Sequence, residues 1–119
     1  MLATLTRRAD FLAAARAGRA GTPGFLLQAR KRREDEADPT ITRVGFTCSR
    51  KVGNAVARNR AKRRLRAVAR DVLAHGGRPG WDYVLIGRAG TTATRPFDSL
   101  VTDLECALRR VHRPGTSRT

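Results

Sequence analysis

The sequence is poor in acidic residues, lysine and aromatic side chains. Ten Asp and Glu residues stand against 25 Lys and Arg in 119 residues, so the formal net charge is +15 and the isoelectric point is near 11.8. Lysine occurs only at positions 31, 51 and 62. Guanidinium groups pair with phosphate oxygens and stack on flat rings, although a genome-wide codon bias would produce the same arginine preference. A charge this high favours a nucleic-acid ligand over a membrane surface or an acidic protein.

Cysteine and long apolar runs are also scarce. Cys48 and Cys106 form no CxxC pair and lie in apolar patterns, so we expect buried free thiols and no zinc site. His75 and His112 are near neither cysteine in the sequence. No apolar run approaches the roughly 18 residues of a membrane span, and the N-terminus lacks the hydrophobic segment of a secretory signal. We therefore expect a cytoplasmic protein without a membrane partner.

The chain has no obvious catalytic group. The acidic cluster at 34–38 lies beside a basic run at 31–33, which indicates a self-neutralising exposed loop and not a metal site. Neither histidine has an acid or base partner at a telling spacing, and no glycine pattern of the Walker or dinucleotide type occurs. We expect no catalytic residue and no metal ligand in the protein itself.

The length predicts one domain, residues 1–119. Hydrophobic periodicity predicts the order helix, strand, strand, helix, strand, helix. The expected elements are a helix within 1–18, strands at 25–30 and 41–49, a helix at 55–74, a strand at 81–88 and a helix at 96–112. Thr6 is the expected cap of the first helix and Gly18 its stop. Residues 19–24 and 89–94 are expected to be loops, and residues 113–119 a disordered tail.

Alternation along the strands predicts which side chains share a face. In the strand at 25–30, positions 25, 27 and 29 lie on one face and 26, 28 and 30 on the other. In the strand at 41–49, Val44, Phe46 and Cys48 point one way, while Thr47 and Ser49 point the other way. We expect these two strands to pair antiparallel. The strand at 81–88 is almost continuously apolar, which predicts cover on both of its faces.

Positive charge is concentrated between Arg50 and Arg70, where nine of the residues are Lys or Arg. Asn54 is a good N-cap for a helix that follows it. On that helix one side is apolar and the opposite side is polar: the apolar set is Ala57, Ala61, Leu65, Val68 and Val72, and the polar set is Asn59, Lys62, Arg63, Arg66 and Arg70. One side can bury against a sheet while the other presents cations to a phosphate backbone.

The stretch Arg43–Arg66, RVGFTCSRKVGNAVARNRAKRRLR, closely resembles the signature of the bacterial ribonuclease P protein subunit. The Asp10-Phe11 helix, the Asp82-Tyr83 strand and the last amphipathic helix follow in the family's order. The resemblance implies an α+β sandwich around a central mixed sheet, similar to a fold seen in some ribosomal proteins. It also implies a left-handed crossover through the basic helix, whereas the general rule for such connections predicts a right-handed one.

The resemblance further implies a function. The protein would bind a catalytic RNA and the 5′ leader of precursor tRNA, and would be a monomer without RNA. The complex would remove the leader by Mg²⁺-dependent hydrolysis, with the active site and its Mg²⁺ held mainly by the RNA. A structural ribosomal protein or a general RNA chaperone is the alternative, and a self-sufficient nuclease is disfavoured by the missing acid and base groups.

Two sets of site residues follow from the resemblance. The residues matching the block that meets the catalytic RNA are Arg58, Asn59, Arg60, Lys62, Arg63 and Arg66. The residues expected around the leader, in a cleft between the first helix and the sheet, are Phe11, Gln28, Thr47, Ser49, Arg50, Lys51, Asn54 and Arg88. Three positions depart from the family pattern: Ala15 and Gln28 stand where relatives often carry aromatics, and Ala61 replaces a larger aliphatic residue.

Aromatic side chains that could stack on bases are few. Phe11, Trp81 and Tyr83 are the ones outside obviously buried positions. Each can act either as a base platform or as part of the core.

Overall fold

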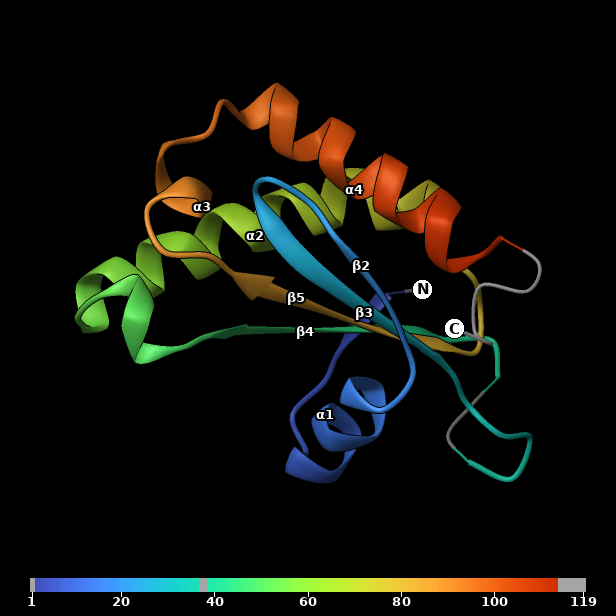
Figure 1. The fold of residues 1–119 in the computed structure, drawn as a ribbon. Helices are drawn as coiled ribbons and strands as arrows, with labels where there is room; N and C mark the ends of the chain where they lie inside the picture. Colours follow the sequence, from blue (N-terminus) through green and yellow to red (C-terminus); the bar gives the residue numbers. More distant parts are fainter. Residues whose placement is uncertain (1, 37–38, 114–119) are drawn as a thin grey trace.

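The fold is built on a mixed sheet of five strands, shown in Figure 1. The computed structural model describes residues 2–36 and 39–113. The strands are β1 (Leu2–Thr4), β2 (Gly18–Gly21), β3 (Phe25–Lys31), β4 (Thr42–Cys48) and β5 (Trp81–Gly87), in the spatial order β1-β4-β5-β3-β2. The helices are α1 (Arg8–Ala15), α2 (Ala55–Gly76), α3 (Thr91–Thr94) and α4 (Phe97–Val111), with a 3₁₀ turn η1 (Arg50–Val52) before α2.

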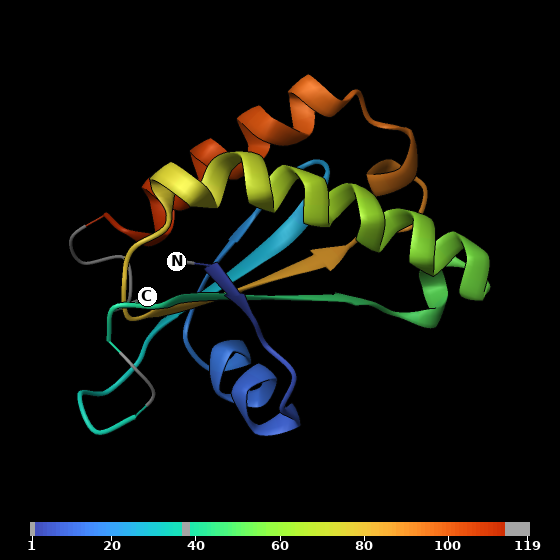
Figure 2. The same cartoon turned by 180° about the vertical axis from the view of Figure 1, so that it is seen from behind.

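The helices cover the two faces of the sheet unequally. Figures 1 and 2 show α2 and α4 on one face and α1 alone on the other. The main core lies under α2 and α4, where the side chains of Phe25, Leu65, Tyr83 and Leu104 are completely buried. These are the sides of the strands and helices that the apolar pattern predicts to face inward. No helix of the described ranges is both long and apolar enough to cross a bilayer.

Strand pairing differs from the expectation in one respect. β4 pairs in parallel with both β1 and β5, and β3 pairs antiparallel with β5 and β2. The expected antiparallel pairing of β3 with β4 is therefore wrong, because β5 lies between them. β5 has the most continuous apolar sequence of the strands, and a central position covers both of its faces.

Two short strands lie outside the expected elements. β1 falls in residues predicted to be loose, and β2 falls in the predicted loop at 19–24. β1 has only three residues and β2 is the sequence GRAG, so neither has a local strand signal. Both are ordered by pairing with neighbours: Leu2 lies opposite Thr42, and Gly18 opposite Ala29.

The connection from β4 through α2 to β5 is a left-handed crossover. With α2 in front of the sheet and both strands pointing upward, β5 lies to the left of β4 (Figures 1 and 2). The general right-handed expectation is wrong here, and the handedness implied by the family resemblance is confirmed.

The termini of the helices agree with the sequence in part. Asn54 caps α2 as expected, since its Oδ1 accepts a hydrogen bond from the backbone N–H of Ala57 at 2.9 Å. Thr6 does not cap α1: the cap position is Arg7, which makes no side-chain cap bond. Gly18 does not end α1 either, because it is already the first residue of β2.

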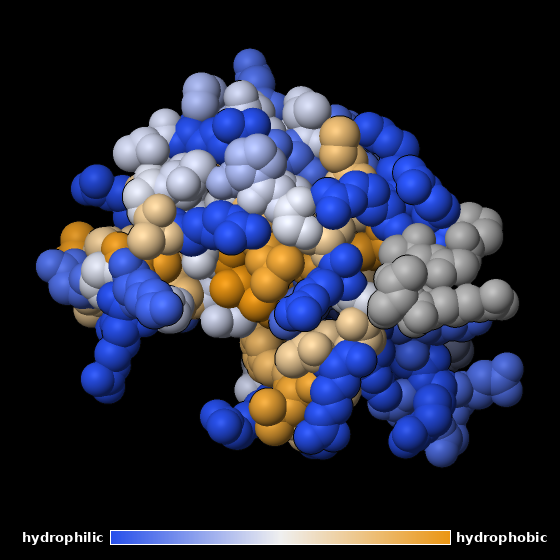
Figure 3. Space-filling model, viewed as in Figure 1, coloured by the Kyte–Doolittle hydropathy of each residue, from blue (hydrophilic) through white to orange (hydrophobic). Residues whose placement is uncertain are grey.

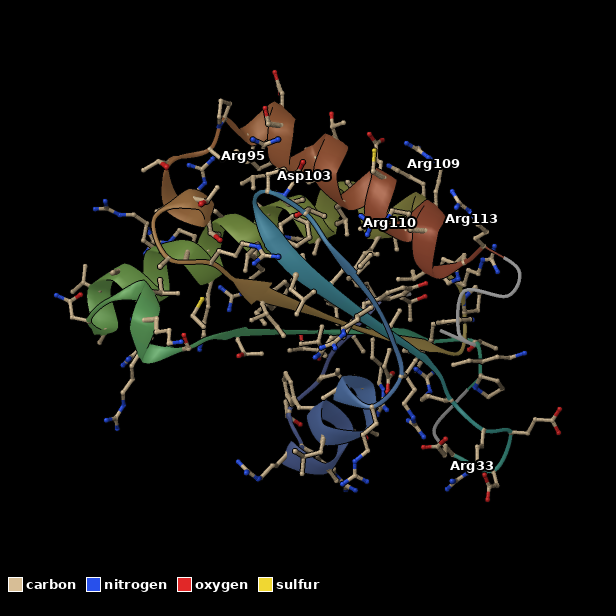
Figure 4. All side chains as sticks on the ribbon, in the orientation of Figure 1. Arg33, Arg95, Asp103, Arg109, Arg110 and Arg113 are labelled. Atoms are coloured by element: carbon tan, nitrogen blue, oxygen red, sulfur yellow. The ribbon has the colours of Figure 1, made fainter. Side chains whose placement is uncertain are left out.

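The expected loop at 89–94 contains a helical turn, since residues 91–94 form α3. The turn is held by Thr92, whose buried hydroxyl donates to the carbonyl of Gly24 at 2.6 Å. Figure 4 shows a second tie nearby, between Arg95 and Asp103. Arg95 Nε lies 2.8 Å from Asp103 Oδ2. The bond from Thr92 joins residues far apart in sequence, so local patterns could not predict it.

Both cysteines are free and half-buried, so the expected free thiols are confirmed and their full burial is not. Burial raises the pKa of the Cys48 thiol. The predicted tail lies outside the described residues from position 114 onward.

His112 ends α4 in a neutral, half-buried position. The hydroxyl of Tyr83 accepts a hydrogen bond from the backbone N–H of Arg78 at 3.0 Å and lies 2.6 Å from His112 Nε2. The hydroxyl and the imidazole share this second hydrogen bond, and its direction depends on the tautomer of His112. Burial, with a smaller contribution from the charge of Arg78, lowers the pKa of His112 to about 4. Burial raises the pKa of Tyr83 to about 12.

This arrangement predicts a pH-dependent stability. The pKa of His112 falls from 6.5 in the unfolded chain to about 4 in the folded one, so its contribution is complete above pH 6.5. As the pH falls from 6.5 toward 4, that contribution disappears. Urea unfolding of His112→Gln at a series of pH values should show a smaller decrease in stability than the wild-type chain over this interval. His75→Gln changes an exposed histidine on α2 and should retain the wild-type profile; equal profiles for all three proteins would contradict the assignment.

Candidate nucleic-acid interface

The first candidate surface is the solvent side of α2. We call Arg58, Asn59, Arg60, Lys62, Arg63 and Arg66 the cationic face. Four of these side chains are exposed, and Arg58 and Lys62 are half-buried at the edge of the helix. The opposite side of α2 is buried on the sheet through Ala61, Leu65, Val68 and Val72. The structure thus separates the polar and apolar sides of this helix as its periodicity predicts.

The cationic face divides into rows that point in different directions. Arg58, Lys62 and Arg66 are spaced by four residues and run along the side nearest β4. The guanidinium of Arg66 lies 5.5 Å from the ring centroid of Phe46 on β4, a cation–π contact that holds it in place. Asn59 and Arg63 point outward, and Arg60 lies toward α3. An RNA could therefore meet cations along two sides of the helix.

One neighbouring arginine serves the fold instead. Arg64 Nη1 donates to the carbonyl of Ala93 at 2.8 Å, and its other terminal nitrogen donates to the carbonyl of Arg95. These bonds attach α2 to α3 and to the start of α4. Arg64 is therefore distinct from the cationic face, in agreement with its omission from the predicted set.

Within the described residues, no acidic side chain forms an ion pair with the cations of the cationic face. In residues 2–36 and 39–113 the ion pairs involve other arginines, namely Arg30, Arg32, Arg33, Arg43 and Arg95. Unpaired cations held on a rigid helix attract a phosphate backbone and release its counterions on binding. The acidic residues in these pairs are thus used for internal structure, and the cationic face remains free for a ligand.

The second candidate surface is the opposite face of the sheet, where α1 lies. Gly45 on β4 is needed here because Phe11 packs directly on it: a Cβ at position 45 would lie 2.6 Å from the Phe11 ring. Phe11, Ala14 and Leu5 form a small apolar cluster with Val84 and Ile86 of β5. This contact fixes α1 on the sheet and leaves Thr47, two residues after Gly45 on the same face, half-exposed beside α1.

The predicted leader residues differ in how accessible they are to a ligand at this surface. Phe11 packs on Gly45, and Thr47 lies two residues further along the same face of β4. Gln28 belongs to the same face but is only 8 % exposed, so little of its side chain can contact a ligand. Arg88 is exposed, and its Nε donates to the carbonyl of Thr22 at 2.9 Å, which directs the guanidinium to the β2–β3 turn.

The end of β4 supplies the basic rim of this surface. Ser49, Arg50 and Lys51 are exposed in and beside η1. The Ser49 hydroxyl accepts a hydrogen bond from the backbone N–H of Lys51 at 3.3 Å, and Asn54 is engaged as the cap of α2. In Figure 3 the outline of the molecule is notched between α1 and the end that carries η1. We call Phe11, Gln28, Thr47, Ser49, Arg50, Lys51, Asn54 and Arg88 together the α1-side surface.

Three apolar residues at these surfaces were missed by the sequence reasoning. Ile86 lies opposite Thr47 in the β4–β5 register, and Leu26 lies opposite Ile86. Leu26, Thr47 and Ile86 therefore share one face of the sheet. Val56, at the start of α2, is 68 % exposed among the cations. The alternation of β5 could have placed Ile86 beside Thr47 if the pairing of β4 with β5 had been known.

A buried ionic cluster closes the other end of the α1-side face. Asp82 is fully buried, and its carboxylate is held by Arg32 at 2.5 Å and by Arg43 at 2.7 Å. Arg43 also lies 3.4 Å from Asp10 of α1, and Arg30 lies 3.8 Å from Asp82. The hydrogen bond from Arg43 to Asp82 raises the pKa of Arg43. We call these five residues the Asp82 cluster, and it ties β3, β4, β5 and α1 together.

The part of the chain that the structure describes contains no assembled metal site. No group of three or more His, Cys, Asp and Glu side chains there could hold a metal ion. The carboxylates closest to the α1-side surface, Asp10 and Asp82, are engaged by arginines. The residues present therefore do not fit a protein-held divalent cation at this surface.

Comparison with known proteins gives a consistent result over most of the chain. The family model described as Ribonuclease P matches residues 2–112. The ribonuclease P protein component of Ruegeria pomeroyi is 63% identical over 113 residues, which cover 95% of this chain and 89% of the relative. That of Caulobacter vibrioides is 50% identical over 104 residues, covering 87% of this chain and 67% of the relative.

Solved structures agree in fold. The RNase P protein from Thermotoga maritima superposes with a TM-score of 0.72 at 27% identity, covering 91% of this chain and 96% of that one. The RNase P protein of Staphylococcus aureus gives a TM-score of 0.67 at 24% identity, covering 89% and 92%, and at that identity it is similar in fold alone.

Proposed function

This chain belongs to the ribonuclease P protein family, and we propose that one of its two surfaces binds the catalytic RNA and the other binds precursor tRNA. The chain is the protein component of ribonuclease P, an endoribonuclease of tRNA processing.

The cationic face binds the catalytic RNA subunit. The observation that carries this assignment is that none of its five cations forms an ion pair within the described residues, whereas the buried Arg32 and the half-buried Arg30, Arg43 and Arg95 all do. A 22-residue helix with two cationic sides can follow a folded RNA backbone over several phosphates. Asn59 adds a side chain that can both donate to and accept from a base or sugar.

The α1-side surface binds the 5′ leader of precursor tRNA. Its open part has an apolar floor beside Thr47 and a basic rim at Arg50 and Lys51. A single strand needs such a combination, because bases are laid on apolar surface while phosphates are met by cations. Both surfaces adjoin η1. The protein would therefore bind the leader close to the point where it contacts the catalytic RNA.

The catalytic Mg²⁺ belongs to the RNA in this proposal. The protein positions the substrate and supplies positive charge, whereas the RNA holds the metal and the reacting groups. The carboxylates available near the α1-side surface are already bound by arginines, which supports this division. The proposal includes a cytoplasmic location, where precursor tRNA is transcribed and processed, and a monomeric protein before it meets RNA.

The leader assignment predicts a selective loss. The double variant Arg50→Ala/Lys51→Ala, assembled with the catalytic RNA, should bind a precursor tRNA with a leader about 1–3 kcal/mol more weakly, because two phosphate contacts are removed. Mature tRNA, which has no leader, should bind with unchanged affinity. Equilibrium binding of both ligands measures the difference.

Arg33→Ala is the matched control, since Arg33 is an exposed arginine on the loop after β3, far from η1 (Figure 4). It should leave both affinities unchanged. Equal losses for leader-bearing and mature tRNA in the double variant would show that the rim does not contact the leader.

A further inference from the structure

A second basic groove lies at the end of the sheet opposite η1. Its volume is about 850 Å³, within the range of ligand-binding pockets. It is formed where the C-terminal end of α1 and the start of β2 approach the ends of β3 and α4 and the beginning of β5. We call it the Trp81 groove, after the tryptophan in its lining.

The charge of this groove is available to a ligand. Arg16, Arg19 and Lys31 line it and are exposed. None of the three takes part in an ion pair within the described residues. Figure 4 shows Arg110 and Arg113 at the adjoining end of α4. Arg110 donates to the carbonyl of Gly21 at 2.8 Å, which holds that cation against the edge strand β2.

Trp81 gives the groove an ordered aromatic ring. The ring is half-buried, meets His112 edge to face at 4.4 Å between centroids, and stacks at 6.3 Å on Tyr83. These contacts hold the indole in place. Ala29 and Val111 complete an apolar lining.

A flat ring among unpaired cations suits single-stranded RNA. A base can stack on or lie against the indole while the neighbouring phosphates meet the arginines, and each such base contact contributes about 1–3 kcal/mol. Of the three rings considered as base platforms, Tyr83 is completely buried and Phe11 is packed on Gly45, so Trp81 is the one best placed to contact a base.

The position of the groove indicates which RNA fills it. The basic rim at η1 and the start of α2 lie at one end of β4, and the groove lies beyond the other end, past the Asp82 cluster. The molecule is 38 Å long. A short leader held at η1 is separated from the groove by α1, whereas a large folded RNA can contact both ends. We propose that the Trp81 groove binds a single-stranded segment of the catalytic RNA subunit, and this inference rests on the proposed function.

The single tryptophan makes the groove directly observable, because all indole fluorescence reports Trp81. A single-stranded hexaribonucleotide should quench this fluorescence in the free protein. The double variant Arg16→Glu/Arg19→Glu changes only exposed side chains, and it should weaken the binding of the hexanucleotide by about tenfold or more. Arg7→Glu/Arg8→Glu, the same double reversal of exposed arginines at the opposite end of α1, should change the affinity much less. Absence of quenching, or equal losses in the two variants, would overturn the proposal.

Fluorescence measured with the catalytic RNA and with precursor tRNA tests which of the two RNAs fills the Trp81 groove. The catalytic RNA alone should quench Trp81, and a leader-bearing precursor added afterwards should cause no further change. If only the precursor quenches, the groove takes the leader and the proposal is wrong. Binding of the catalytic RNA is measured in parallel by gel shift. Binding without quenching would contradict only the role of the Trp81 groove, whereas no binding at all would contradict the proposed function.

Discussion

Replacing Asp82 with alanine should lower the free energy of unfolding by about 3–5 kcal/mol, the loss found when one partner of a buried ion pair is removed. The carboxylate is fully buried and receives hydrogen bonds from both Arg32 and Arg43. Without it, the Arg32 side chain, only 1% exposed, would remain charged in the interior beside β5. Urea unfolding at neutral pH measures the change.

Asp71→Ala is the matched control for this loss, because Asp71 is an exposed aspartate on α2. It should change the stability by less than about 0.5 kcal/mol. An Asp82→Ala protein as stable as the control would show that the Asp82 cluster does not hold the three strands and α1 together.

The double variant Arg58→Ala/Arg60→Ala should bind the catalytic RNA much more weakly, by about 1–3 kcal/mol for each side chain. The two arginines lie on different sides of α2, so their effects should be nearly additive. Because cations bound to phosphates release counterions, the dependence of log affinity on log salt should become shallower by about one for each arginine that no longer meets a phosphate. Filter binding across a salt series gives both quantities.

The stability of this variant should stay close to that of the wild-type chain, since neither arginine forms an ion pair in the described ranges. Arg33→Ala removes one exposed arginine outside the cationic face and should leave affinity and salt slope nearly unchanged. If the double variant kept the wild-type affinity and slope, the cationic face would not be the surface that binds the catalytic RNA.

Local sequence was sufficient for the helices that carry the site. The spacing of Ala61, Leu65, Val68 and Val72 indicates which side of α2 is buried, and Asn54 marks its beginning. Both signals depend on residues within a few positions of each other, as helix formation does. The solvent side of α2, and hence the cationic face, follows from the same pattern.

Strand order could not be obtained in this way, because it depends on contacts between distant residues. β1 becomes a strand only by pairing with β4, about forty residues later, and β5 inserts between β3 and β4. The Asp82 cluster has the same origin: Arg32 and Arg43 lie 50 and 39 residues from Asp82 in the sequence. A buried charge of this kind has no local signal.

The α1-side surface could be predicted from local sequence only in part. Alternation along β4 correctly puts Thr47 on the face opposite Val44 and Phe46. The alternation does not reveal that Gln28 is almost fully covered, or that Arg88 is directed to the β2–β3 turn. Those details depend on tertiary packing, of which the contact of Phe11 with Gly45 is an example.

The most direct test of the account is cleavage of a leader-bearing precursor tRNA by the catalytic RNA at low Mg²⁺, with and without this protein. We expect the protein to raise both the cleavage rate and the affinity for the precursor relative to mature tRNA. If neither quantity rises, the protein does not act as the substrate-binding subunit of ribonuclease P, and the assignment of its surfaces is wrong.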